Sequence, residues 1–159
     1  MKYKIIIFLL LISLLILAGC SVNANHGSNN NTDNEKVKVK IFKSSSCGCC
    51  DAYSKYMDSK GYDVEIINVD PTKLSEIKNQ YGVPSELQSC HTMIVGNYFV
   101  EGHVPLEAVE KMMQEKPDIK GIGISGMPSG APGMPGSKSE VWTIQAVNMD
   151  DSLSEFMTI

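Results

Sequence analysis

The chain has 159 residues and a formal net charge of −4, and all fourteen of its basic residues are lysines. An acidic chain without arginine is poorly suited to bind nucleic acid, because neutralising phosphates requires clustered positive charge. The part of the chain that we expect to fold is long enough for one domain with its own core.

The chain begins with a segment that is typical of a secretory signal. Lys2 and Lys4 precede an apolar run from Ile5 to Leu17. As a helix this run spans about 20 Å, which is short of the roughly 30 Å hydrocarbon core, so we interpret it as a signal peptide. It ends in Leu17-Ala18-Gly19-Cys20, which resembles the lipobox of bacterial lipoproteins. Residues 1–19 are therefore expected to be removed and Cys20 to be lipidated.

Residues 20–36 are predicted to be a flexible tether between the lipid and a folded domain. The stretch from Ser21 to Glu35 is rich in Asn and Ser and nearly devoid of large apolar side chains. It cannot bury enough surface to offset the entropy lost on ordering. We thus expect an extracytoplasmic lipoprotein anchored at a cell membrane; the alternative is an ordinary cleavage site with an accidental cysteine.

Residues 37–159 show the periodicity of an α/β domain. The expected elements are a strand at 37–42, a helix after the thiols that stops at Gly61, a strand at 64–69, a helix at 71–81, a hairpin of 92–95 with 98–101, and a helix that begins near Leu106. Residues 121–136 are too rich in Gly and Pro to predict regular structure. Residues 141–147 and 153–159 are expected to form a last pair of strands.

The strand–helix–strand spacing predicts a parallel pair with a right-handed crossover. The resulting order is a βαβαββα core with a C-terminal β-hairpin extension. This order resembles the thioredoxin fold, in which a C-x-x-C motif lies between the first strand and its helix. The resemblance implies that the loop before the third core strand faces that motif.

Three thiols lie in the stretch Cys47-Gly48-Cys49-Cys50, between the first strand and its helix. Cys47 and Cys50 have the spacing of a redox pair, with Cys47 as the nucleophile and Cys50 as the resolving thiol of a thiol–disulfide or copper oxidoreductase. A helix start favours the thiolate form, which serves redox chemistry and metal binding alike. Both functions stay open on this motif alone.

The second group of candidate residues is Cys90 and His91, just before the third core strand. Thioredoxin-like oxidoreductases usually keep a proline there and another inside the motif, where this chain has Cys49. These departures favour a metal site over a redox site. Soft thiolates select copper(I) or zinc. The candidate ligands are Cys47, Cys49, Cys50, Cys90, His91 and His103, with Met127 and Met134 of the Gly/Pro-rich segment as candidate thioether ligands.

Copper, as Cu(I) and with more than one ion, is the metal we favour. The side chains of the adjacent Cys49 and Cys50 diverge, so they suit bridging thiolates in a small cluster. Zinc is the alternative, because three cysteines and one histidine are also a common zinc set. A further alternative is a pair of structural disulfides, Cys47–Cys50 with Cys49–Cys90.

Five motifs together resemble the CopG-like family of exported copper-resistance and metal-binding proteins. They are Ser46-Cys47-Gly48-Cys49-Cys50, Gly82-Val83-Pro84 leading to Ser89-Cys90-His91-Thr92, Glu101-Gly102-His103-Val104-Pro105, Gly126-Met127-Pro128 and Gly133-Met134. The resemblance covers about residues 37–159. It implies a thioredoxin-like fold and copper sequestration or transfer, and other copper-handling or efflux proteins are the expected partners.

Overall fold

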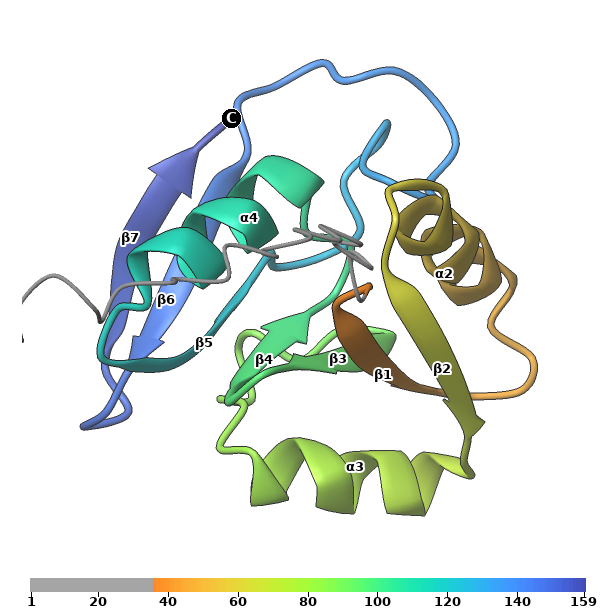
Figure 1. Ribbon diagram of the computed structural model, residues 1–159, viewed down its shortest axis with the longest axis horizontal. Coiled ribbons are helices and arrows are strands. Elements are labelled where there is room, and N and C mark those ends of the chain that lie inside the picture. Colours follow the sequence, from red (N-terminus) through yellow and green to blue (C-terminus); the bar gives the residue numbers. More distant parts are fainter. Residues whose placement is uncertain (1–35) are drawn as a thin grey trace, which may run out of the picture. The chain divides into compact units, whose positions relative to one another are not determined.

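The computed structural model describes residues 36–159 (Figure 1). The predictions of a signal peptide, of a lipidated Cys20 and of a tether therefore concern residues that lie almost wholly outside the described part. Among residues 36–159, none of the helices has the length and apolar character needed to cross a bilayer.

One mixed sheet of seven strands, in the order β2-β1-β3-β4-β5-β6-β7, carries three helices over the described residues. The strands are β1 (Lys38–Lys43), β2 (Asp63–Asn68), β3 (His91–Val95), β4 (Tyr98–Glu101), β5 (Ile119–Gly123), β6 (Thr143–Asn148) and β7 (Leu153–Thr158). The helices are α2 (Gly48–Ser59), α3 (Pro71–Gln80) and α4 (Leu106–Glu115). The prediction of an α/β domain is confirmed.

The described segment from β1 to β4 folds as its periodicity predicted. β1 and β2 are parallel neighbours joined through α2, which is the expected strand–helix–strand unit. β3 lies antiparallel to β1, and β4 returns beside β3 as the expected hairpin. Gly96 in its turn has a φ of +56°, a conformation that glycine adopts without a steric penalty.

Strand β5 (Ile119–Gly123) was not expected, and the prediction that residues 121–136 lack regular structure was wrong for residues 121–123. A Cβ on Gly121 would lie 2.3 Å from the carbonyl oxygen of Phe99, and one on Gly123 would lie 2.7 Å from the Leu87 side chain. Here glycine permits close packing inside a sheet and does not break it. β5 pairs with β4 and with β6, so the C-terminal hairpin of β6 and β7 continues the main sheet.

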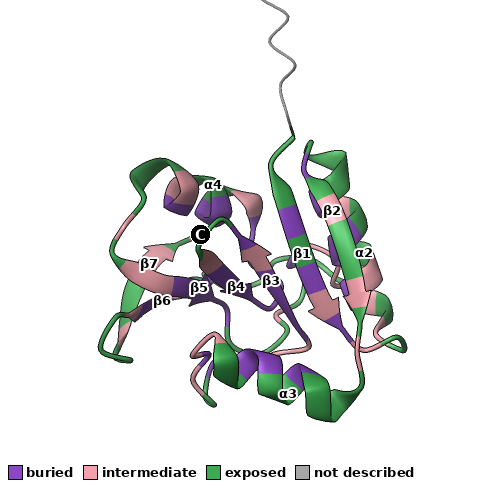
Figure 2. Ribbon diagram, turned by 60° about the horizontal axis from the view of Figure 1, so that its bottom comes forward, coloured by how far each residue is buried: buried purple, intermediate pink, exposed green. Residues whose placement is uncertain are grey.

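The main core lies between one face of the sheet and helices α2 and α4. Tyr53 and Met57 of α2 and Met112 of α4 are fully buried there, while Met113 is half-buried against the same cluster. Helix α3 lies on the other side of the sheet (Figure 1), where Val83, Leu87, Phe99 and Val147 form a smaller cluster. Figure 2 shows the buried positions running along the central strands β3, β4 and β5. Both faces of the central sheet are therefore covered, which holds the ends of β1, β3 and β4 in place.

Candidate metal centre

The thiol stretch folds into the start of helix α2. Cys47 is the N-cap residue, and Cys49 and Cys50 lie in the first turn, as predicted. No side chain caps this end; the Asp51 amide bonds to the Cys47 carbonyl oxygen at 3.3 Å. Cys50 is buried, whereas Cys47 and Cys49 are half-buried.

Cys47 and Cys50 are joined by a disulfide bond, so the C-x-x-C spacing does bring this pair together. Cys49 is a free cysteine, and its Sγ atom lies 3.6 Å from the Sγ atom of Cys47. Cys90 is also free. Of the two disulfides in the alternative prediction, only Cys47–Cys50 is therefore present, because Cys49 and Cys90 are not joined.

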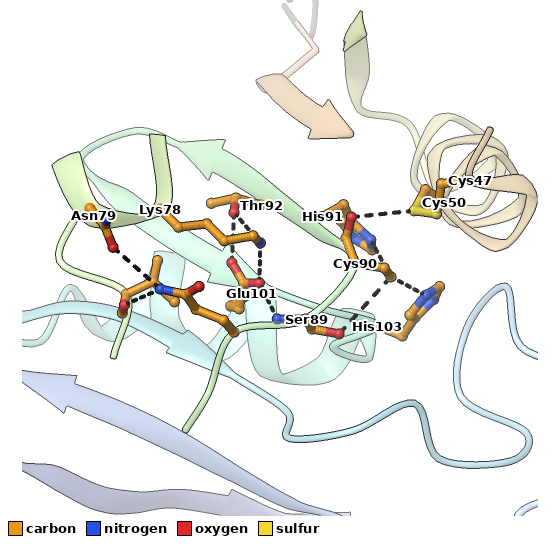
Figure 3. Close-up of polar contacts among 12 residues, drawn as sticks. Cys47, Cys50, Lys78, Asn79, Ser89, Cys90, His91, Thr92, Glu101 and His103 are labelled. Carbon is orange, nitrogen blue, oxygen red and sulfur yellow. Dashed lines mark hydrogen bonds and ion pairs between the residues drawn. A yellow bond between two sulfur atoms is a disulfide. The ribbon is translucent and has the colours of Figure 1, made fainter. Parts of the chain in front are cut away.

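The start of strand β3 brings the second group of candidate ligands to the thiols. His91 pairs in register with Lys43, the last residue of β1, from which the chain turns into the thiol stretch. The carbonyl oxygen of Cys90 lies 3.8 Å from the Sγ atom of Cys50 (Figure 3). The segment before β3 thus faces the C-x-x-C stretch, as predicted.

His103 completes the arrangement from the loop after β4. Its Nε2 atom lies 3.1 Å from the Cys90 Sγ atom, and the Nδ1 atom of His91 lies 3.4 Å from the same sulfur (Figure 3). His103 Nδ1 donates to the carbonyl oxygen of Pro132 at 2.6 Å, which leaves Nε2 as the nitrogen with a free lone pair. A backbone acceptor that holds the second nitrogen is the usual outer partner of a metal-binding histidine.

The protonation states of these side chains also suit a metal site. Burial keeps the pKa of His91 well below its usual range, and His103 and two lysines add to this; burial also lowers the pKa of His103. Both rings are therefore neutral and able to donate a lone pair near pH 7. Burial and the neighbouring Cys49 raise the pKa of the Cys90 thiol to about 11, so binding a metal there would release a proton.

The six predicted Cys and His ligands fall into two sets that share one residue. The thiol set is Cys47, Cys49, Cys50 and Cys90, and the mixed set is Cys90, His91 and His103. Within each set all ligand atoms lie within 4.8 Å of one another. Ligands with metal bonds of about 2.0–2.3 Å stand roughly 3.3–3.8 Å apart around a tetrahedral ion, so the mixed set fits with small shifts. The thiol set fits once its disulfide is reduced.

The two methionines of the Gly/Pro-rich segment occupy different environments. Met127 is 54% exposed, while Met134 is half-buried and packs against the hydrophobic core. Their role as ligands stays a prediction. The contribution of this segment that the sequence did not predict is the Pro132 carbonyl group on His103.

A buried lysine beside the thiols was also not predicted from the sequence. Lys43 is only 2% exposed, and its Nζ atom lies 2.8 Å from a carboxylate oxygen of Asp51 and 3.1 Å from the Ser44 carbonyl oxygen. It thereby contacts the chain both before and after the thiol stretch. The available signal was the alternation of β1, since Lys43 falls on the same buried face as Val39 and Ile41.

Replacing Gly133 with alanine is expected to lower the free energy of unfolding by about 1–3 kcal/mol. A Cβ there would lie 2.7 Å from the Tyr53 amide nitrogen and 2.9 Å from the Cys49 carbonyl oxygen, so the segment that holds His103 must move away from α2. Gly126→Ala is the matched control, because Gly126 also has a positive φ but meets nothing within 4 Å. Equal losses in urea denaturation of the two variants would contradict this packing.

The stability of the metal-free protein is expected to fall as the pH drops from 7.5 to 5.5. The folded-state pKa values of His91 and His103 lie below the ordinary 6.5, so the unfolded chain takes up protons first. Each histidine adds a slope of up to about 1.4 kcal/mol per pH unit once the pH is below about 6.5. Urea denaturation across this window measures the slope, which should be smaller in His91→Gln. A flat profile would show that the two rings are not held neutral.

Comparison with known proteins places this site in a defined context. A family described as "Protein of unknown function, DUF411" matches residues 87–134, a span that contains Cys90, His91 and His103. Two solved structures named "Copper resistance protein copG", forms 2 and 1, are similar at 30% and 29% sequence identity, each with a TM-score of 0.71. Each similarity covers 78% of this chain and 98% of the other. No curated protein matches this chain.

Proposed function

Because this chain belongs to the CopG-like family that its motifs predicted, we propose that it binds copper and supports copper resistance by sequestering or transferring the ion. The observation that carries this proposal is the meeting of four cysteine sulfurs and two neutral imidazoles from three separate segments. Thiolates and imidazoles are ligands that copper prefers over oxygen donors. The related solved structures bear the name of a copper resistance protein, which favours copper over zinc.

The bound form we propose is Cu(I), with more than one ion per chain. Two donor sets that share Cys90 supply more ligands than one ion uses. A shared thiolate and the neighbouring Cys49 and Cys50 suit bridging between ions. The half-buried Cys47 and Cys49 leave the thiol set accessible to an exchange partner.

The fold we propose for residues 37–159 is a thioredoxin-like variant. Its support is the placement of the C-x-x-C stretch between β1 and α2, with β2 parallel and β3 antiparallel to β1. The C-terminal strands extend that arrangement through β5.

The location we propose is outside the cytoplasm, at a membrane, through a lipid on Cys20. This rests on the leader and its lipobox-like end. Other copper-handling or efflux proteins are the proposed partners, since a tethered copper carrier needs a source and an acceptor. Labelling of the full chain with a lipid precursor tests the anchor, with Cys20→Ala as the control.

A second function, thiol–disulfide or copper oxidoreductase, is favoured by one observation: Cys47 and Cys50 are already joined as a disulfide. Reduction of this bond adds two thiolates to the thiol set, so redox state and copper binding are coupled. Equilibration in glutathione buffers tests for a reversible couple. A disulfide that does not respond at any ratio of reduced to oxidised glutathione would exclude this second function.

The test of the main proposal is metal analysis of the full chain purified from copper-fed cells, together with a count of free thiols. We expect at least one equivalent of copper and a matching loss of reactive thiols. The control replaces all four cysteines of the thiol set with serine and should lose the metal. Zinc in place of copper, or an unchanged copper content in the control, would overturn the proposal.

A further inference from the structure

A buried ion pair lies directly behind the mixed set. Lys78 of α3 and Glu101 at the end of β4 have side chains that are 5% and 0% exposed, and Lys78 Nζ lies 2.5 Å from Glu101 Oε1. Such a pair is costly to bury and is not by itself stabilising. The sequence patterns did not predict this ion pair, since the proposed ligands are all Cys, His or Met.

The Glu101 carboxylate also bonds to the chain on both sides of the ligands Cys90 and His91. Its Oε1 atom accepts from the Ser89 amide at 2.6 Å, and its Oε2 atom accepts from the Thr92 hydroxyl at 2.6 Å (Figure 3). Lys78 Nζ donates to the same Thr92 hydroxyl oxygen at 3.0 Å. One carboxylate therefore accepts hydrogen bonds from both the residue before Cys90 and the residue after His91.

His103, the third ligand of the mixed set, is also positioned close to Glu101. Glu101 precedes His103 by two residues, and the intervening Gly102 donates its amide to the His91 carbonyl oxygen at 3.1 Å. A Cβ on Gly102 would lie 3.0 Å from the Ser89 side chain, so the two segments are in close contact. The backbone on both sides of Cys90 and His91, and the backbone just before His103, thus converge on Glu101.

We propose that Glu101, held by Lys78, is the positioning residue of the mixed set, and that it orients Cys90, His91 and His103 for copper without touching the ion. This inference rests on the proposed function. Residues that orient metal ligands from behind commonly change metal affinity by about 10- to 100-fold when they are replaced. Glu101 does this through its hydrogen bonds to Ser89 and Thr92. These hydrogen bonds, more than the charge of Glu101, therefore set the copper affinity of the mixed set.

The test compares two full-chain variants that both remove the ion pair. Lys78→Met with Glu101→Leu leaves the Ser89 amide and the Thr92 hydroxyl without their acceptor. Lys78→Met with Glu101→Gln keeps an amide oxygen that can accept from the Ser89 amide, and its NH2 group can donate to the Thr92 hydroxyl oxygen. Copper(I) is offered to each reduced protein without oxygen, in competition with a chromophoric chelator. We expect the leucine variant to bind copper about 10- to 100-fold more weakly and the glutamine variant to recover most of that loss.

The same comparison with Cys47, Cys49 and Cys50 all replaced by serine leaves only the mixed set, and the loss should persist there. Val147→Ala, a truncation in the separate cluster on the other face, is the control for lowered stability and should keep its copper affinity. Equal affinity in the wild type and the leucine variant overturns the proposal. An equal loss in the leucine and glutamine variants also overturns it, because charge and not hydrogen bonding would then be responsible.

A metal-free measurement separates this inference from the proposed function. The Ser89 amide should exchange slowly with deuterium in the wild type and faster in the leucine variant, as followed by NMR. A wild type that binds no copper would remove the proposed function, while the exchange rates would still report whether Glu101 holds this segment. Unchanged exchange at Ser89 would show that it does not.

Discussion

Replacing Cys90 with serine is expected to weaken copper(I) binding at least 100-fold, about 2.7 kcal/mol, and to lower the number of ions bound per chain. Cys90 is the one residue that both donor sets contain, so its loss removes a ligand from each. Its sulfur lies 3.1 Å from His103 Nε2 and 3.4 Å from His91 Nδ1, and a serine oxygen is a harder and poorer ligand for copper(I). Anaerobic titration against a copper(I) chelator measures both quantities.

Cys49→Ser is the matched control for this prediction. Cys49 belongs to the thiol set alone and, like Cys90, is a free, half-buried thiol. We therefore expect a smaller loss of affinity, with the mixed set still able to bind an ion. If Cys90→Ser and Cys49→Ser lose the same amount, the two sets do not share a ligand in the metal-bound protein.

Replacing Lys78 alone with methionine is expected to lower the free energy of unfolding of the metal-free protein by about 3–5 kcal/mol. The side chain of Glu101 is fully buried, and this change leaves its carboxylate without its cation. Burial already raises the pKa of Glu101, and Lys78 is the largest opposing influence. Such a loss is a large part of the total stability of a small domain, so the variant should unfold at clearly lower urea concentration.

The control for the lysine replacement is the double variant Lys78→Met with Glu101→Gln. Neither position then carries a charge, and the amide can still bond to Ser89 and Thr92. We expect it to regain most of the stability, because removing both partners of a buried ion pair is often nearly neutral. A single variant within about 1 kcal/mol of the wild type would contradict this prediction, because Glu101 would then be uncharged in the folded variant.

Local patterns in the sequence were sufficient to predict most of the elements. Alternation predicted β1, and Gly96-Asn97 marked the turn between β3 and β4. The helix after the thiols was predicted together with its first turn, where Cys49 and Cys50 lie. These elements are determined by the residues within them, which is why a single sequence is sufficient to predict them.

Strand β5 could not be predicted in the same way. Its Gly121 and Gly123 are needed because of Phe99 and Leu87, which are distant in sequence. Out of that context, glycine is a signal for a turn. The partner strands β4 and β6 decide that this segment is extended.

The sequence by itself determined which candidate ligands this protein has: soft thiol and imidazole groups placed at the start of a helix, before a strand and after a hairpin. Only the tertiary structure decided how they are grouped, with Cys90 shared between two sets and the tautomer of His103 set by Pro132. The buried Lys78–Glu101 pair behind them also emerged only there. The physical reason is that residue type sets which atoms can bind a soft metal, whereas distances, burial and hydrogen bonds depend on segments far apart in the chain.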